Sequence, residues 1–203
     1  MLHTMDVRRW LAGFAMVATL GFAMPAAAQF SDSYNFLKAV KDKDVGKARE
    51  IVEKPGNTII NTRDPDTGGT ALHIATRRSD APWVGFLLQE NADTNSRDRD
   101  GNTPLIVAAQ ARWSEGVRIF LSIKARVDEQ NRLGETALQT AVQNRDSYVT
   151  KMLIDAGASP DMNDNSGKSA RSLADGDPRN AAIAKLFKDV PVRKPKPVQG
   201  PSL

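Results

Sequence analysis

Residues 101–108 read GNTPLIVA, and similar octets begin at residues 68 (GGTALHIA), 134 (GETALQTA) and 167 (GKSARSLA). The octets start 33 residues apart, so the chain contains an internal repeat with that period. The second half of each unit repeats as well, as the apolar pairs Leu87-Leu88, Phe120-Leu121, Leu153-Ile154 and Leu186-Phe187. A period of this length predicts a solenoid of stacked units.

Each unit is interpreted as two short helices. Thr103 can cap the first helix because its hydroxyl accepts from free backbone N–H groups, and Pro104 fits the first turn, where no N–H is needed. Ala108 is small enough to let the two helices approach, and Phe120-Leu121 supplies the apolar face of the second. One such pair cannot bury its apolar face alone, so neighbouring units must stack.

These residues resemble the ankyrin repeat. The stretch GTALHIA at 69–75 matches the T-P-L-H-x-A signature, GNTPL at 101–105 matches G-x-T-P-L, and LIDAGASPD at 153–161 is similar to the ending L-L-x-x-G-A-D-x-N. The resemblance covers Ser33 to Lys188. It implies an all-α ankyrin-repeat solenoid of about five stacked helix pairs, joined by β-hairpin-like loops.

The expected ankyrin-repeat domain covers residues 29–188. Its units are predicted at about 33–67, 68–100, 101–133, 134–166 and 167–188. The last unit is degenerate, since Arg171 breaks the series Leu72, Leu105 and Leu138, and we expect it to act as a polar cap. Residues 189–203 are basic and rich in proline, and we expect a disordered tail there.

Residues 1–28 have the pattern of a secretory signal peptide. Arg8 and Arg9 precede a charge-free apolar stretch from Trp10 to Met24, and Ala26-Ala27-Ala28 offers small residues for cleavage before Gln29. The alternative is a retained anchor, but a 15-residue helix spans about 22 Å of a ~30 Å hydrocarbon core. We therefore expect export to a bacterial periplasm, with no membrane span after cleavage.

Composition narrows the function classes. Among 203 residues there are no cysteines and two histidines, which excludes disulfides, thiolate catalysis, Cys-ligated zinc and a His-rich metal site. The net charge of +4 is too small to argue for a nucleic-acid partner. The recurring aspartates Asp64, Asp98 and Asp164 are expected to brace their own turns. In the ankyrin context His73 looks structural, so we expect no enzyme activity, cofactor or metal.

The resemblance implies a concave protein-binding surface of hairpin tips and first helices. Carried over by register, the predicted partner-binding residues are Arg63, Arg77, Arg97, Arg99, Asp100, Gln110, Arg132 and Gln143, together with Trp113 at a turn between helices. The arginines could form a basic groove for an acidic protein partner, or a solvated rim in which their charges do little. Trp113 is either an interface anchor or a side chain folded over Ser114, whereas Trp83 has the register of a core residue.

Several consensus glycines are replaced. Ser79, Arg112 and Arg145 stand between paired helices, and Asn91 and Lys124 follow second helices. A left-handed conformation costs a non-glycine residue about 1 kcal/mol. We therefore expect a moderately stable solenoid, weakest near Lys124.

The predicted function is a non-enzymatic, monomeric, protein-binding scaffold in the periplasm, with an envelope or periplasmic protein as partner. The alternative is an envelope-surface adaptor, in which Arg193, Lys194 and Lys196 of the tail bind anionic lipid or cell-wall polymer.

Overall fold

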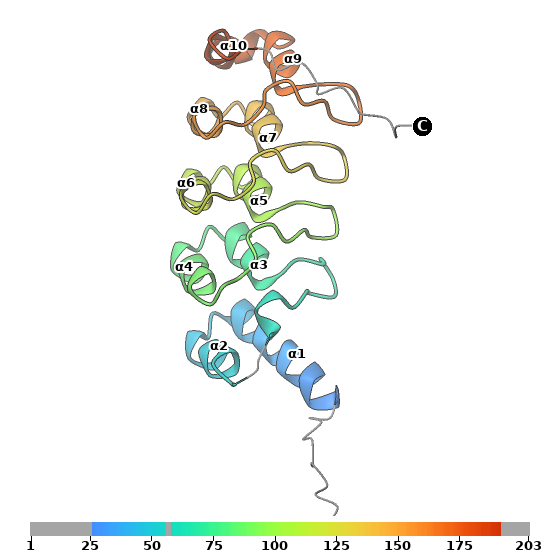
Figure 1. Cartoon of the computed structure of the whole chain (residues 1–203), viewed down its shortest axis with the longest axis vertical. Helices are drawn as coiled ribbons and strands as arrows, with labels where there is room; N and C mark the ends of the chain where they lie inside the picture. The colour runs from blue at the N-terminus through green and yellow to red at the C-terminus, as the bar shows by residue number, and fades with distance from the viewer. Residues whose placement is uncertain (1–25, 56–57, 192–203) are drawn as a thin grey trace, which may run out of the picture.

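The computed structural model describes residues 26–55 and 58–191, with side chains from residue 32 onward. Within this part, five helix pairs follow one another along the chain, as predicted (Figure 1). The pairs are α1 (Ala26–Asp42) with α2 (Val45–Val52), α3 (Ala71–Arg77) with α4 (Ala81–Gln89), α5 (Pro104–Gln110) with α6 (Ser114–Ser122), α7 (Ala137–Gln143) with α8 (Ser147–Asp155), and α9 (Ala170–Asp175) with α10 (Ala181–Phe187). Short 3-10 helices η1 (Ile59–Asn61) and η2 (Pro178–Asn180) complete the set.

The pairs stack as a column with two helical layers. The first helices of successive units pack on one another, as do α6, α8 and α10, and the connecting hairpins project from one side (Figure 1). The expected cleavage point before Gln29 falls within α1. The expected signal segment up to residue 25 lies outside the described residues, and so do tail residues 192–203 with their basic side chains.

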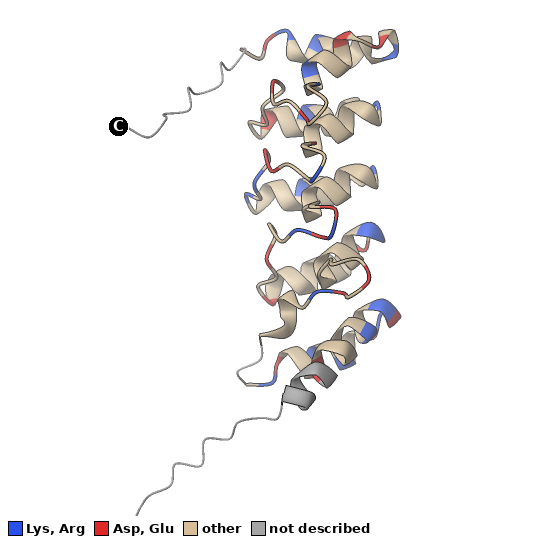
Figure 2. Cartoon of the chain, turned by 90° about the vertical axis from the view of Figure 1, so that its right-hand side faces the viewer, with Lys and Arg blue, Asp and Glu red and all other residues tan. Residues whose placement is uncertain are grey.

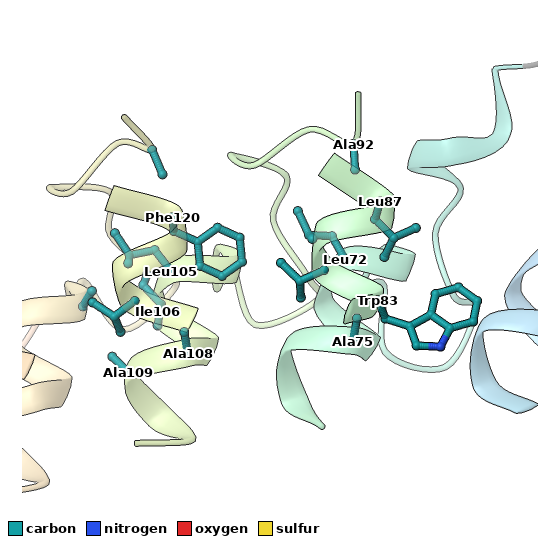
Figure 3. Packing of buried hydrophobic residues seen from close by; sticks show 14 of the residues in the cluster. Leu72, Ala75, Trp83, Leu87, Ala92, Leu105, Ile106, Ala108, Ala109 and Phe120 are labelled. Atoms are coloured by element: carbon teal, nitrogen blue, oxygen red, sulfur yellow. The ribbon is translucent and has the colours of Figure 1, made fainter. Parts of the chain in front are cut away.

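The repeated residues form the core predicted from their register. Leu72, Ala75, Leu105 and Ala108 are almost fully buried, and neighbouring units contribute to one continuous apolar cluster (Figure 3). Trp83 is also buried, packed edge-on against Phe86 at 5.7 Å between ring centroids, which confirms its assignment to the core.

Arg171 closes the C-terminal end of the column. It occupies the position of Leu105 and Leu138, and because no further helix pair follows α10 among residues 26–55 and 58–191, the side chain is only partly buried. Its Nε donates to Asp161 Oδ1 at 2.6 Å, and its Nη1 donates to the Phe187 carbonyl at 2.6 Å. The arginine that breaks the leucine series therefore ties α9 to the end of α10 through polar bonds.

The hairpins are connected by a ladder of backbone and side-chain hydrogen bonds. The Arg99 N–H donates to the Thr67 carbonyl at 2.9 Å, and equivalent bonds join the later hairpins. The first residues of three hairpins, Arg63, Arg97 and Gln130, each donate to a glycine carbonyl of their own hairpin and to a carbonyl of the next. Each hairpin therefore holds its successor in place.

The glycine replacements adopt the expected left-handed conformation. Ser79, Arg112 and Arg145 have φ values of 53°, 53° and 57°, and Asn91 and Lys124 have 61° and 58°. This confirms that non-glycine residues occupy strained positions at these turns. That the solenoid is weakest near Lys124 stays a prediction.

His73 joins two units through its buried ring. Nδ1 accepts from the Thr70 N–H at 3.1 Å, so Nε2 carries the proton and donates to the Asn102 carbonyl at 3.0 Å. Two units later Gln139 makes the same two bonds: Oε1 accepts from the Thr136 N–H and Nε2 donates to the Lys168 carbonyl, both at 2.8 Å. This agrees with the structural role expected for His73.

We predict that acid weakens the fold through His73. Burial disfavours the charged ring and lowers its pKa below the ordinary value of 6.5. The unfolded chain therefore takes up the proton first, and stability, complete above pH 6.5, falls as the pH drops through the folded pKa. His73→Gln is expected to keep stability and lose this dependence, because Gln139 provides the same bonds without titrating.

Urea unfolding followed by circular dichroism at a series of pH values measures this effect. His73→Ala is the companion variant and is expected to cost about 3 kcal/mol at neutral pH, through a cavity and an unsatisfied carbonyl. A wild-type profile identical to that of His73→Gln would contradict the prediction.

Candidate functional site

The expected binding surface corresponds to the side of the column that carries the hairpins. We call it the hairpin face, formed by hairpin residues 63–69, 97–102, 130–135 and 163–168 together with the last residues of α3, α5 and α7, whose side chains bond to hairpin residues. Eight of the nine predicted site residues lie on it, and Trp113 lies elsewhere. The predicted residues on this face are Arg63, Arg77, Arg97, Arg99, Asp100, Gln110, Arg132 and Gln143.

Four of these arginines are used within the protein. Arg63 and Arg97 belong to the hairpin ladder, and Arg97 also pairs with Glu129. Arg99 Nη2 donates to the Pro65 carbonyl at 2.7 Å, and Arg77 pairs with the buried carboxylate of Asp98. These guanidinium groups therefore brace the hairpins, and the face is less uniformly basic than the residue count suggested.

Amide and carboxylate side chains line the face at the third and fourth units. Asn102 Oδ1 accepts from Gln110 Nε2 at 3.2 Å and from Asn131 Nδ2 at 3.1 Å. Glu135 continues the chain, since its carboxylate accepts from Asn131 at 3.3 Å and from Gln143 at 2.8 Å. This network runs from one unit to the next and fixes the orientation of its side chains.

The tip of the third hairpin presents a cation beside an apolar side chain. Arg132 is exposed, and its guanidinium makes no hydrogen bond or ion pair with any described residue. Leu133, the next residue, is 63% exposed, and its carbonyl accepts from the Asn165 N–H of the next hairpin. Sequence reasoning placed both at a tip but did not count Leu133 among the binding residues, because exposure of a leucine is not readable from register.

A pocket that sequence reasoning missed lies at the N-terminal end of this face. Its volume is about 630 Å³, and it separates α1 from the first hairpin. Tyr34, Leu37 and Pro65 give it an apolar lining, with Tyr34 67% exposed. The pocket exists because α1 has 17 residues where α3 has 7, so its extra turns lie along the hairpin. The only sequence signal was the irregular spacing of the first unit.

An ion pair fixes the wall of this pocket. Lys41 Nζ lies 2.5 Å from the buried carboxylate of Asp64, which also accepts from the Thr67 N–H and hydroxyl. Burial alone would raise the pKa of Asp64, but the bonds from Lys41 and Thr67 outweigh it and lower the pKa below 3.8. The carboxylate is therefore charged at neutral pH and braces its turn, as expected for the recurring aspartates.

Trp113 lies in the turn after α5, at the N-cap of α6. Its ring lies over Gly116, where an added Cβ would come within 2.0 Å of a ring carbon. It is partly buried and makes no side-chain cap bond, a loss of about 1 kcal/mol relative to a capping aspartate. The ring thus packs over Gly116. The expectation had been either an interface anchor or a ring folded over Ser114.

Metal-binding clusters and membrane-spanning helices are both absent from residues 26–55 and 58–191. This part of the chain holds no group of three or more His, Asp or Glu side chains placed to bind a metal ion. Its helices are too short or too polar for any of them to cross a bilayer.

This chain is similar in sequence to short segments of much longer known proteins. The chain is 34% identical to human 2-5A-dependent ribonuclease over 84 residues, which is 41% of this chain and 11% of that protein. It is 36% identical to oxysterol-binding protein homolog 1 of Saccharomyces cerevisiae over 73 residues, 34% of this chain and 6% of the relative. A BTB/POZ domain and ankyrin repeat-containing protein of Oryza sativa subsp. japonica is 44% identical over 66 residues, 32% and 13% of the two chains.

Family comparison covers most of the column. A model described as ankyrin repeats (3 copies) matches residues 26–131, and a single ankyrin repeat matches residues 133–165. These ranges include four of the five helix pairs, and the stacking and hairpins agree with them. The chain belongs to the ankyrin repeat family.

Proposed function

We propose that this protein is a non-enzymatic scaffold that binds another protein through its hairpin face. Ankyrin repeats generally mediate protein–protein interaction, which supports this class of function. The observation that carries the proposal is the pair Arg132 and Leu133, exposed on a hairpin that the ladder holds in place. A preorganised surface of this kind loses little conformational entropy when it binds.

The chemistry of the face indicates the kind of partner. Arg132 offers a planar guanidinium able to hold a carboxylate bidentately, and Leu133 offers apolar contact beside it. The exposed amides of Gln110 and Gln143 each donate one N–H within the face and keep a second N–H for a partner. An acidic protein surface with an apolar residue fits this combination.

The location in this proposal is a bacterial periplasm, with an envelope or periplasmic protein as partner. The support is the sequence of residues 1–28, with its charged start, apolar stretch and small residues. The rival is attachment to anionic lipid or cell-wall polymer through Arg193, Lys194 and Lys196. Three such charges at about 1 kcal/mol each give weak, salt-sensitive binding.

Export predicts a defined mature N-terminus. Expressed with its full sequence in a Gram-negative host, the protein is expected in the periplasmic fraction, beginning at Gln29. Intact-mass spectrometry of that fraction measures the cleavage. Cytoplasmic protein of full mass would contradict the proposed location without affecting the proposed binding face.

The double change Arg132→Glu with Leu133→Ser is expected to weaken partner binding about tenfold or more, because both anchors are lost and the new charge repels an acidic partner. Crosslinked capture of tagged protein from periplasm, read by quantitative mass spectrometry, identifies the partner, and titration with it measures the loss. Arg118→Glu, an equal charge reversal on the exposed side of α6, is the matched control.

Equal capture of one partner by wild type and the double variant would refute binding at this hairpin. If capture is instead lost on deleting residues after Asp189, and released by moderate salt, the tail carries the attachment.

A further inference from the structure

The turns between paired helices form a second polar edge. We call it the turn edge, formed by residues 43–44, 78–80, 112–113, 145–146 and 177–179. It follows the C-terminal ends of the first helices, whereas the hairpins lead into their N-terminal ends, and Figure 2 shows basic residues at this edge in successive units. Because α5 has seven residues rising 1.5 Å each, this edge lies about 10 Å from the hairpin end of the same helix.

In four of the five units an aspartate stands at this edge and caps the next helical segment. Asp44, Asp80, Asp146 and Asp177 accept from backbone N–H groups two or three residues later, at 2.9 to 3.4 Å. Two of these aspartates also neutralise a cation of the preceding unit, Lys43 with Asp80 and Arg145 with Asp177, both at 3.4 Å. The edge is thus a row of capped and largely charge-balanced turns.

The third unit departs from this rule. Trp113 stands where the other units have the aspartate, and α6 has no side-chain cap. Its ring is seated on Gly116 and only partly buried, and the indole N–H has no acceptor among the described residues. The neighbouring Arg112 is exposed and makes no ion pair in the described part of the chain. This turn therefore lacks a side-chain cap and places the partly exposed ring of Trp113 beside Arg112, a cation without an ionic partner among the described residues.

The adjacent unit extends the same surface. Tyr148, one period of 33 residues after Glu115, is 64% exposed at the first turn of α8, and α8 packs directly on α6. Arg145 precedes it at the same turn, with nearly half of its side chain exposed. Trp, Tyr and Arg are the residue types that carry most of the binding energy in protein interfaces.

We propose that the turn edge of units three and four, anchored by Trp113, is a second docking surface, for an acidic peptide segment that carries an apolar side chain. The apolar side chain packs against Trp113 and Tyr148, and a carboxylate of the segment pairs with Arg112, whose charge no described residue balances. The missing aspartate matters twice, since a carboxylate at position 113 would repel such a segment and would leave no ring to contact.

Selection of short random peptides displayed on phage against the purified protein tests this proposal. The enriched peptides are expected to be rich in Asp and Glu around an aromatic or aliphatic residue. Fluorescence anisotropy of one enriched peptide, synthesised with a label, then measures affinity. Trp113→Asp and Arg112→Glu are each expected to weaken binding about tenfold or more, and the double variant Arg132→Glu with Leu133→Ser is expected to bind unchanged.

Thermal unfolding separates binding from packing. Trp113→Asp restores a side-chain cap but removes the ring packed on Gly116, so its unfolding temperature is expected to fall modestly while the variant stays folded at the temperature of the binding assay. If this variant fails to fold, Arg112→Glu at an exposed position decides the matter alone. Enriched peptides without acidic residues, no enrichment at all, or undiminished binding by Arg112→Glu would overturn the proposal. If peptide affinity falls only in the Arg132→Glu with Leu133→Ser variant, the proposal is also overturned, and the peptide binds the hairpin face instead.

Discussion

The column depends on the burial of each unit's apolar surfaces by its neighbours. A single 33-residue unit has two short helices and no interior of its own, so Leu105 and Ala108 become buried only when units stack on both sides. This constraint explains why the apolar positions repeat, and why the chain ends differ. In the last helix pair of the described residues, Arg171 stands at the leucine position and pairs with Asp161.

Polar bonds between units are added to this apolar stacking. The ring of His73 and the amide of Gln139 each join a helix to the next hairpin. The ladder of Arg63, Arg97 and Gln130 joins the first residue of each hairpin to that of the next. Some of the residues that register assigned to partner binding, such as Arg63 and Arg97, therefore have a structural role. A hairpin arginine is available to a partner only if its guanidinium does not already donate to a carbonyl of a neighbouring hairpin.

The fold was predictable because its signals are local and repeated. The period, the caps such as Thr103, and the small Ala108 are visible in any single unit, and four units agree on them. The candidate site was predictable only in outline. Register placed Gln110 and Arg132 on the hairpin face, but the pocket beside Tyr34 and the exposed Leu133 arise from the length of α1 and the spacing of the hairpins. The length of α1 and the spacing of the hairpins depend on contacts between distant residues, and no residue type at a fixed position of the repeat indicates them.

The sequence by itself determined the repeat, the two helices of each unit, the core positions and the left-handed turns at Arg112 and Lys124, because each depends on residue type at a fixed spacing. Only the tertiary structure decided which polar side chains remain free. Arg99 and Arg132 occupy the same position in successive hairpins, yet Arg99 donates to the Pro65 carbonyl of the hairpin before it and the Arg132 guanidinium bonds to no described residue. The difference lies in which groups the adjacent unit places within reach of each guanidinium, and only the stacking of the units determines that.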